Sequence, residues 1–359
     1  ILTSQILGIV LTKRANGKAA DVDLAGFPHH ALDNYLPKLV KAGHRVAICE
    51  QVEDPKIAKG IVKREVVEVV TPGTLTSDRT LNDRSNRYIG SIFSIKQYSG
   101  FSFLDSSTGE FYIGECDNND LNSFLIKFRP QEIIVSEKAK YATSNWYMEF
   151  QPFMSRVDDW MFDHDSAYRF LLKHFEVKTL KGFGCQNMKV GICAAGALSN
   201  HMQTNLSSSL KHVSKLSPVL SEGVMGLDTS TVKNLEIFQS LSSQGVHGTL
   251  IECLDITKTS SGGRLLRKWL INPSTDLKQI ELRHNIVEAF TKEKQLLKSF
   301  TKSLSVISDL QRILGKINKA KATPREIYAI AATLSKIPDW KEKLLKTNNE
   351  YLIDLSRIF

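Results

Sequence analysis

The sequence predicts a multi-domain protein in which mixed α/β segments precede an all-α segment. A chain of 359 residues is long enough for two or three domains with full cores. β-branched runs of strand length alternate with helical apolar stripes in the first part of the chain, whereas the pattern from residue 209 onward is almost wholly helical. We therefore expect a small mixed α/β domain at 1–73, a linker at 74–87, a second α/β domain at 88–208, and the first part of a helical domain at 209–359.

The first domain is predicted to contain a helix, two strands and a tight turn. The helix covers Ala31–Ala42, where apolar residues recur at helical spacing until Gly43 ends the run. The segment Ala25–His30 before it is turn-forming, so its backbone and imidazoles could approach a ligand closely. The strands are Arg45–Cys49 and Glu65–Val70. The opening letters ILTSQILGIVLTKR indicate the tail of an amphipathic helix without an initiating Met, which suggests a piece of a longer protein.

Residues 88–208 are predicted to form a sheet with flanking helices. Three strand-like runs separated by hairpin signals come first, followed by a helix at Leu121–Phe128 and a strand at Glu132–Val135. The three runs are Tyr88–Ile95, Gly100–Asp105 and Glu110–Cys116. Three antiparallel strands, a helix and another strand are the opening of an RNase H-like layout. Two further helices are expected, at Ala167–Phe175 and Val190–Gln203.

An RNase H-like sheet raises the alternative of a nuclease, which needs several carboxylates gathered around divalent metal. Asp105 lies at the end of a predicted strand, and Glu110 and Asp120 follow it. The next predicted strand runs into Ser136 instead of a second aspartate. We therefore favour a sheet with incidental turn carboxylates, without catalytic or metal-binding residues.

The helical segment is predicted to include a structural hinge at Gly262–Ile271, with Ser260-Ser261 as its N-cap. Its apolar residues are expected to be buried, and its basic residues to be solvated or paired within the molecule. The apolar set is Leu265, Leu266, Trp269 and Leu270, and the basic set is Arg264, Arg267 and Lys268.

Two other helix starts are visible in this segment. Asp228 enters a helix whose expected apolar positions are Val232, Leu235, Phe238 and Leu241. Thr323 is an N-cap followed by Pro324 at the first helical position and Glu326 at the third, which together predict a helix start.

The charge distribution favours a polyanionic partner for part of the chain. The formal net charge is +9. Residues 1–73 hold 10 basic and 8 acidic residues, residues 74–208 hold 14 and 15, and residues 209–359 hold 23 and 15, so the excess lies in the last segment. A solvated lysine-rich face is the alternative explanation for any single cluster.

The five cysteines are scattered, odd in number and mostly within apolar stretches: Cys49, Cys116, Cys185, Cys193 and Cys253. This usage predicts reduced thiols in a cytosolic protein and no catalytic thiol, because no cysteine has basic, partly exposed surroundings. No apolar run reaches the ~18 residues of a membrane span, and no signal peptide is visible, so no membrane partner is expected.

Several stretches resemble MutS-type DNA mismatch-repair proteins. VLTKR, LAGFPHHALDNYLPKLVKAGHRVAICEQVEDPK and KREVVEVVTPG resemble the mismatch-binding domain. YIGSIF, GFSFLDSSTGEFYIGE, HFEVKTLKGFG and CAAGAL are similar to the connector domain, an RNase H-like scaffold in that family. MGLDTSTVKNLEIFQSL and SGGRLLRKWLINP resemble the start of the core, or lever, domain. The matches follow the family order along nearly the whole chain.

The resemblance implies which residues of the first domain face DNA. They are Lys13, Arg14, Gly26, Phe27, Pro28, His29, His30, Lys38 and Arg64. Arginines at strand ends suit contact with phosphates or the minor groove, and glycine and proline in the turn let its backbone approach closely. The two histidines lack a third ligand at suitable spacing, so they are expected to be polar groups near DNA and not a zinc site.

Two functional parts of the family are missing from the letters of this chain. The family inserts a Phe from a Phe-x-Glu motif into the base stack, and no such motif precedes Ile1. A phosphate-binding loop is also missing, because Gly17-Lys18 is followed by Ala and Gly315-Lys316 by Ile. We therefore expect no enzyme activity and no cofactor in this segment, whereas the full-length protein would be a DNA-dependent ATPase using ATP and Mg²⁺.

The resemblance also implies partners. They are double-stranded DNA carrying mismatches or small insertion/deletion loops, MutL bound through residues 88–208, and a second copy of the full-length protein, in the bacterial cytoplasm near the nucleoid. Three alternatives stay open: an RNase H-like nuclease with a basic helical appendage, a MutS-related recombination protein, and a multi-domain scaffold without nucleic-acid contact. The intact first-domain strings argue against the recombination protein, whose relatives usually lack that domain.

Overall fold

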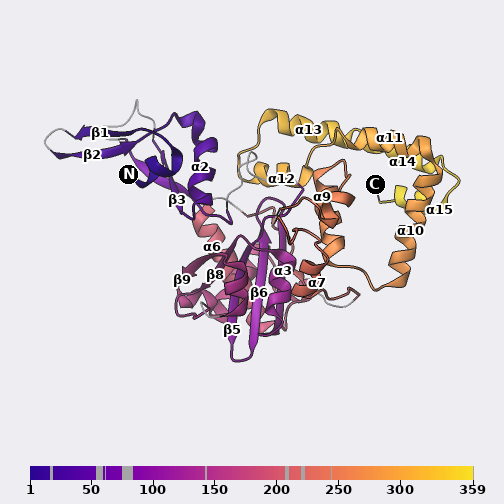
Figure 1. The fold of residues 1–359 in the computed structure, drawn as a ribbon, viewed down its shortest axis with the longest axis horizontal. Coiled ribbons are helices and arrows are strands. Elements are labelled where there is room, and N and C mark those ends of the chain that lie inside the picture. Colours follow the sequence, from indigo (N-terminus) through magenta and orange to yellow (C-terminus); the bar gives the residue numbers. More distant parts are fainter. Residues whose placement is uncertain are drawn as a thin grey trace. The chain divides into compact units, whose positions relative to one another are not determined.

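The computed structural model describes residues 1–16, 19–53, 60, 62–74, 84–141, 144–206, 210–219, 223–243 and 245–358. The chain divides into two compact units. The sheet unit comprises residues 1–82, 87–121 and 128–218, and the helical unit comprises 83–86, 122–127 and 219–359. The protein is thus mixed α/β with a sheet and many helices (Figure 1). Among the helices in the described ranges, none is both long and apolar enough to cross a bilayer.

The beginning of the sheet unit consists of two separate two-stranded antiparallel sheets and short helices (Figure 1). α2 buries Leu36 and Val40 against Val70 at the end of β4, and it stops before Gly43, whose φ of 84° is left-handed. The elements are α1 (Leu2–Leu7), β1 (Leu11–Asn16), β2 (Ala19–Ala25), η1 (His29–Ala31), α2 (Leu32–Lys41), β3 (Val46–Gln51) and β4 (Arg64–Val70). The predicted helix and two strands are therefore present, with boundaries shifted by one or two residues.

The β1–β2 hairpin was not predicted. The opening helix ends at Gly8, whose φ of 65° is left-handed, and the chain then enters β1. Leu11, Val22 and Leu24 are all exposed on the hairpin. A ribbon that buries neither face lacks the apolar alternation by which a half-buried strand is recognised.

The β3–β4 pair contains a bulge. Ile48 is opposite Glu68, but the next residue, Cys49, is opposite Val66, so Val67 is an extra residue in β4. A bulge of this kind changes the phase of the side chains on the bulged strand.

The main sheet has six strands in the order β10-β7-β6-β5-β8-β9. β5, β6 and β7 form the predicted antiparallel meander, β8 runs parallel to β5, and β9, which was not predicted, runs parallel to β8. The strands are β5 (Ile89–Ile95), β6 (Tyr98–Asp105), β7 (Glu110–Asp117), β8 (Glu132–Ser136), β9 (Phe153–Val157) and β10 (Ser217–Pro218). The helices in this part of the chain are α3 (Leu121–Phe128), α4 (Asn145–Phe150), η2 (Asp159–Phe162), α5 (His164–Phe175), η3 (Lys181–Phe183) and α6 (Lys189–Leu206).

α6 lies unusually close to the sheet. A Cβ built on Gly100 of β6 would lie 2.2 Å from the Val190 carbonyl carbon, so only glycine fits there. The Glu115 carboxylate of β7 accepts hydrogen bonds from the amides of Val190 and Gly191, at 2.5 and 2.9 Å, and so caps the start of the helix. The core between sheet and helices contains Ile89, Leu104, Ile113, Ile192 and Leu198, all with no measurable exposure.

The helical unit packs around a smaller core. Phe300, Trp340, Leu344 and Leu352 are its buried members together with Ala289. The elements are α7 (Thr229–Asn234), α8 (Leu250–Leu254), α9 (Ser260–Ile271), α10 (Leu277–Lys292), α11 (Lys294–Leu304), α12 (Leu310–Asn318), α13 (Pro324–Leu334), α14 (Ile337–Leu345) and α15 (Glu350–Ser356). The predicted start of α13 is confirmed, because Thr323 and Glu326 form a full capping box.

Two helix predictions in this unit were wrong in part. α7 ends at Asn234, and Glu236 adopts a left-handed φ of 45°, so Leu235 and Leu241 are exposed instead of forming a helical stripe. α9 starts at Ser260 with Thr259 as its N-cap, one residue before the predicted Ser260-Ser261 pair.

The burial of α9 departs from the prediction at two of its four apolar positions, because Leu266 and Leu270 are partly buried but Leu265 and Trp269 are exposed. Arg264 is 4% exposed, whereas Leu265 and Trp269 are 47% and 41% exposed. The Arg283 guanidinium covers the Trp269 ring, with its central carbon 3.8 Å from the ring centroid. The helix turns Arg264 toward the interior, which the apolar periodicity did not indicate, but Arg264 is paired with Asp309 there, in agreement with the expectation of solvated or internally paired basic residues.

Candidate nucleic-acid interface

The turn between β2 and η1 is held by aromatic stacking and leaves its backbone open. The rings of Phe27 and Tyr35 stack with centroids 4.7 Å apart and an interplanar angle of 28°. A Cβ built on Gly26 would meet no atom within 4 Å, and Pro28 and His30 are exposed. The predicted open turn is therefore a fixed structure whose polar backbone groups can be approached.

His29 connects this turn with the β3–β4 sheet. Its Nε2 lies 3.7 Å from Oε1 of Glu50 on β3. In the ladder, Glu50 is opposite Glu65, and the next pair joins Gln51 to Arg64. The structure therefore brings the turn and Arg64, which are far apart in the sequence, to the same end of one sheet.

Lys38 also belongs to this cluster. Its ammonium lies 5.2 Å from the centroid of the Tyr35 ring, the ring that stacks on Phe27. An exposed cation–π contact contributes only about 0.5–1 kcal/mol, so an anionic ligand can compete for the ammonium. Lys38 is exposed on α2.

Lys13 and Arg14 were expected at the end of an element, but they lie within β1. Lys13 is exposed and opposite Asp23, and Arg14 is opposite Val22. The side chain of Arg14 lies outside the described part of the structure. Arg64, by contrast, is the first residue of β4, as predicted for a strand-end arginine.

The cluster has mixed charge. Glu50 lies beside His29, and Lys63 forms an ion pair with Glu65, Nζ to Oε1, at 2.6 Å. Among the residues that the structure describes, no three His, Cys, Asp or Glu side chains lie close enough to hold a metal ion. This part of the surface can thus offer hydrogen bonds and single positive charges to a phosphate backbone.

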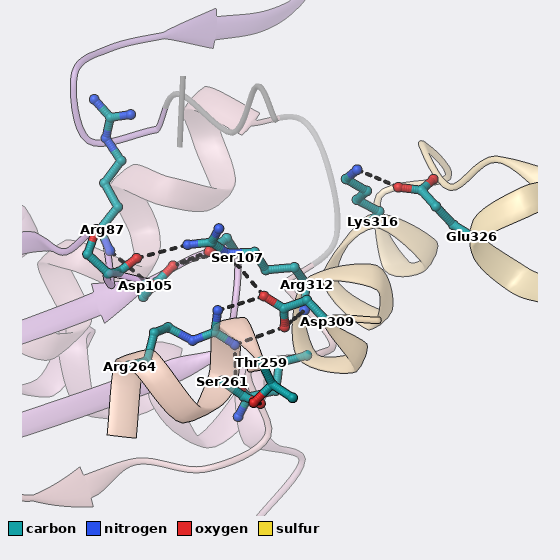
Figure 2. Close-up of polar contacts among 12 residues, drawn as sticks. Arg87, Asp105, Ser107, Thr259, Ser261, Arg264, Asp309, Arg312, Lys316 and Glu326 are labelled. Carbon is teal, nitrogen blue, oxygen red and sulfur yellow. Dashed lines mark hydrogen bonds and ion pairs between the residues drawn. The ribbon is translucent and has the colours of Figure 1, made fainter. Parts of the chain in front are cut away.

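The carboxylates of the nuclease alternative have structural partners. Asp105 accepts hydrogen bonds from the backbone amide of Arg87 at 3.1 Å and from the amide and hydroxyl of Ser107 at 2.9 and 2.6 Å (Figure 2). Glu110 accepts hydrogen bonds from the Tyr88 and Tyr112 hydroxyls at 2.7 and 3.1 Å.

Burial, reinforced by the Glu110 charge, raises the pKa of both tyrosines, which keeps them protonated as donors. Asp120 is exposed in the turn after β7. Asp105 and Glu110, which face each other in the β6–β7 ladder, therefore stabilise local structure, and no third His, Cys, Asp or Glu among the described residues completes a metal-binding group with them.

The five cysteines differ in burial. Cys185 and Cys193 are buried, and burial raises the pKa of Cys193 to about 11. Burial likewise raises the pKa of the half-buried Cys116 to about 12. Cys49 and Cys253 are exposed, contrary to the expectation from their apolar sequence neighbours.

A second polar cluster, missed at the sequence level, lies in the helical unit (Figure 2). Arg264 of α9 forms a two-point ion pair with Asp309, with nitrogen–oxygen distances of 2.6 and 2.8 Å, and also donates to Gln311 at 2.7 Å. Asp309 is itself the N-cap of α12. In the sequence, this cluster could be suspected from an arginine that lies among the apolar residues of α9. The partner itself could not be predicted, because a contact between distant residues produces no periodic pattern.

Residues that the sequence analysis assigned to the linker form hydrogen bonds within the helical unit. Arg84 donates to the Asp255 carboxylate at 3.2 Å and to the Thr257 carbonyl at 3.0 Å. Arg312 donates to the Ser85 carbonyl at 2.9 Å. A Cβ on Gly263 would lie 2.8 Å from Cβ of Arg84, so α9 needs glycine where the chain crosses it.

Three family models match the chain consecutively. The model for MutS domain I matches residues 1–79, that for MutS domain II matches 87–214, and that for MutS domain III matches 230–357. The matched ranges follow the two short sheets, the six-stranded sheet and the helical unit. They define the class, a multi-domain family whose first three domains occur here in order.

The chain belongs to the MutS family. It is 39% identical to the DNA mismatch repair protein MutS of Parabacteroides distasonis over 354 residues, which is 98% of this chain and 40% of that protein. The corresponding protein of Cytophaga hutchinsonii is 39% identical over 356 residues, with coverage of 99% and 41%. That of Salinibacter ruber is 41% identical over 342 residues, with coverage of 94% and 38%. The chain thus spans about two fifths of the length of these curated relatives.

Proposed function

We propose that this chain is the part of a MutS-type protein that contacts mismatched double-stranded DNA and connects that contact to the rest of the protein. In this proposal, the first segment is a partial mismatch-binding domain, the six-stranded sheet is the RNase H-like connector, and the helical unit is the first part of the core. The observation that carries the proposal is the cluster of the Gly26–His30 turn, Lys38 and Arg64 at one end of the β3–β4 sheet. Its aromatic support and open backbone suit a ligand approached from outside.

The DNA contacts are assigned to Lys13, Arg14, Gly26, Phe27, Pro28, His29, His30, Lys38 and Arg64. The lysines and arginines supply charge to phosphates, which dominates affinity. The turn supplies backbone and imidazole hydrogen-bond groups at close range. His29 and His30 act as polar groups in this proposal, and no zinc is invoked.

The proposal is tested by replacing Arg14 and Arg64 together with alanine in the chain of residues 1–359. The probe is a short fluorescent duplex carrying one G·T mismatch, and binding is measured by anisotropy across a potassium chloride titration. Each lost phosphate contact removes about 0.9 from the slope of log affinity against log salt, so the slope should decrease in magnitude by about 2.

A matched control removes two exposed cations elsewhere, Lys346 and Arg357, which have exposed side chains paired with Glu342 and Asp354. Both variants lose two positive charges, so a general charge effect would weaken both equally. Unchanged affinity and slope in the Arg14/Arg64 variant, or equal losses in the two variants, would contradict the assignment.

The remaining parts of the proposal concern the full-length protein. The chain itself is proposed to be catalytically silent, with ATP and Mg²⁺ used by a domain outside it and with a homodimer as the working form. The connector is proposed as a docking platform for MutL. The setting is the cytoplasm of a bacterium, close to the nucleoid.

The nuclease alternative is not favoured. Asp105 already accepts three hydrogen bonds from the protein, and Glu110 accepts two from tyrosines. A two-metal site requires carboxylates with oxygens free to converge on the ions. A Mg²⁺- or Mn²⁺-dependent nick in DNA or an RNA–DNA hybrid, abolished by Asp105→Asn, would promote this alternative.

A further inference from the structure

Glu132, the first residue of β8, is a fully buried carboxylate held by groups without charge. Its exposure is 0%. It accepts hydrogen bonds from the Thr71 hydroxyl, from the Ser155 hydroxyl of β9, and from the backbone amide of Gly73 at 3.0 Å. Within the described residues, no lysine or arginine forms an ion pair with it. Removing a carboxylate from water is costly, and neutral donors offset only part of that cost.

The groups that reach Glu132 belong to the turn that follows β4. Thr71 and Thr74 are 1% and 0% exposed. The amide of Thr71 donates to the Thr74 hydroxyl at 2.7 Å, which closes the turn on itself. Thr74, assigned to the linker from the sequence, is therefore part of a buried structure.

The turn is shaped around the carboxylate. A Cβ on Gly73 would lie 2.9 Å from the Glu132 Oε2 atom and 2.9 Å from Cβ of Ile89. No larger residue fits there without displacing the turn from the sheet. The fit of Gly73 is thus a second, steric observation that the turn is seated on β8 and β5.

His201 of α6 closes the other side of the site. Its Nε2 lies 3.9 Å from the Glu132 Oε1 atom and 2.7 Å from Nδ2 of Asn205, and its side chain is 8% exposed. The positive charge of Arg45 acts on His201, and the Arg45 guanidinium carbon lies 5.7 Å from the Phe153 ring centroid. Glu132 therefore joins three elements, the turn after β4, the β8–β9 pair and α6.

We propose that Glu132 is a positioning residue, which fixes the Thr71–Thr74 turn on the six-stranded sheet and thereby holds the DNA-facing segment in place. The first half of this inference stands on the contacts alone, and the second half rests on the proposed function. β4 carries Arg64 at its start and runs directly into the turn, so a loosened turn releases the strand that presents Arg64.

The test uses Glu132→Gln in the chain of residues 1–359, with hydrogen exchange followed by mass spectrometry. Loss of the charged acceptor should accelerate exchange of the Gly73 and Thr74 amides about tenfold or more, while the β6 amides keep their rates. Glu115→Gln is the matched control. It removes a carboxylate from the same sheet, and the hydrogen bonds of that carboxylate go to the start of α6 and not to the turn. In that control, exchange should accelerate at Val190 and Gly191 and not at the turn.

A second variant keeps the test decisive if Glu132→Gln does not fold. Ser155→Ala removes one donor to Glu132 from β9 without removing a hydrogen bond within the turn, and it should accelerate the same amides by a smaller factor. Wild-type exchange at Gly73 and Thr74 in a folded variant, or equal acceleration throughout the sheet, would overturn the inference.

The link to DNA is read from duplex affinity in the same variants. Affinity should fall severalfold without a change in salt slope, because the bound state keeps its phosphate contacts and the loss comes from ordering the loosened segment. Suppose that the Arg14/Arg64 variant loses affinity for the duplex. A Glu132 variant with a loosened turn and unchanged affinity then overturns the positioning role. If the Arg14/Arg64 variant also keeps its affinity, the proposed function fails, and the exchange result alone decides the role of Glu132.

Discussion

Glu132 in the sheet unit and Asp309 in the helical unit are both shielded from solvent, but their partners differ in kind. Glu132 is fully buried and is held by two hydroxyls and one amide. The Asp309 side chain is 15% exposed and receives both terminal nitrogens of Arg264, with Arg312 Nε at 3.8 Å. One carboxylate is thus solvated by dipoles and the other is neutralised by ions.

The difference predicts how each site responds when one partner is removed. A hydroxyl that is lost from Glu132 leaves two other donors, so the damage stays close to the value of one hydrogen bond. An arginine that is lost from Asp309 removes a full charge from a low-dielectric site, and the remaining carboxylate has to be desolvated with less compensation. Removal of one partner should therefore reduce the free energy of unfolding more at the Asp309 ion cluster than at Glu132, whose partners are neutral.

The largest effect is expected for Arg264→Met. Breaking a buried ion pair on one side typically destabilises a protein by about 3–5 kcal/mol. Urea unfolding of the chain, followed by tryptophan fluorescence, should show this loss in the transition of the helical unit, which contains Trp269 and Trp340. A loss below about 1 kcal/mol would mean that the pair contributes no more than a surface pair does.

The next effect concerns acid and is specific to the sheet unit. Burial, with a smaller contribution from the charge of Arg45, lowers the pKa of His201 from 6.5 to about 4. The unfolded chain therefore binds one more proton than the folded chain between these values, and stability falls as the pH drops through that window. The loss is up to about 3 kcal/mol, less any attraction of the imidazolium to Glu132.

This prediction is checked by measuring unfolding free energy at several pH values between 4 and 7. His201→Gln removes this titrating group and should reduce the fall in unfolding free energy over that range. Burial also lowers the pKa of His174, which contributes part of the pH dependence that remains. A variant with the same pH dependence as the unchanged chain would show that other groups cause the acid sensitivity.

A smaller effect is expected for Ser155→Ala, which removes one neutral donor from Glu132. The expected loss is about 1.5–3 kcal/mol, the usual range for a hydrogen bond to a charged group. Ser94→Ala is the matched control, because within the described part of the chain the Ser94 hydroxyl bonds with the neutral hydroxyls of Ser99 and Tyr141. It should cost about 0.5–1.5 kcal/mol by chemical denaturation. Equal losses would show that the Glu132 charge adds nothing to the bond.

The smallest effect is expected for the exposed pair Lys346–Glu342, whose side chains are 72% and 65% exposed. A double-mutant cycle with alanine at both positions should yield no coupling above the error of the measurement, at low salt or high salt. A clear coupling here would weaken the contrast between buried and exposed ion pairs on which the first prediction depends.

Local pattern was sufficient for the elements whose residues carry their own signals. The meander of β5, β6 and β7 follows from strand-length runs joined by turn residues, and α3 occupies Leu121–Phe128 as predicted. Thr323 and Glu326 mark the start of α13 because the two residues of a capping box are only three positions apart, so the signal is local in the sequence.

Non-local contacts account for what the sequence did not reveal. β9 is half-buried without alternation and becomes a strand by pairing with β8. Arg264 is drawn inward by Asp309, 45 residues away, which no helical stripe can encode. In the candidate interface, the residue types of the turn were recognisable, but its proximity to Arg64 depends on the ladder register of Glu50 and Glu65.

The extra residue in β4 has a consequence for the tolerance of this strand to changes in length. Val67 is unmatched in the ladder, so it sets Arg64 and Val66 one step out of phase with Val69 and Val70. Deleting this one aliphatic residue would restore an unbroken ladder and leave Arg64 opposite Gln51 on its present face, because the residues on both sides of Val67 already have their own partners in β3. The strand can therefore become one residue shorter at this point and still present Arg64 on the same face, so the bulge is a position where a change in length does not alter the charged surface.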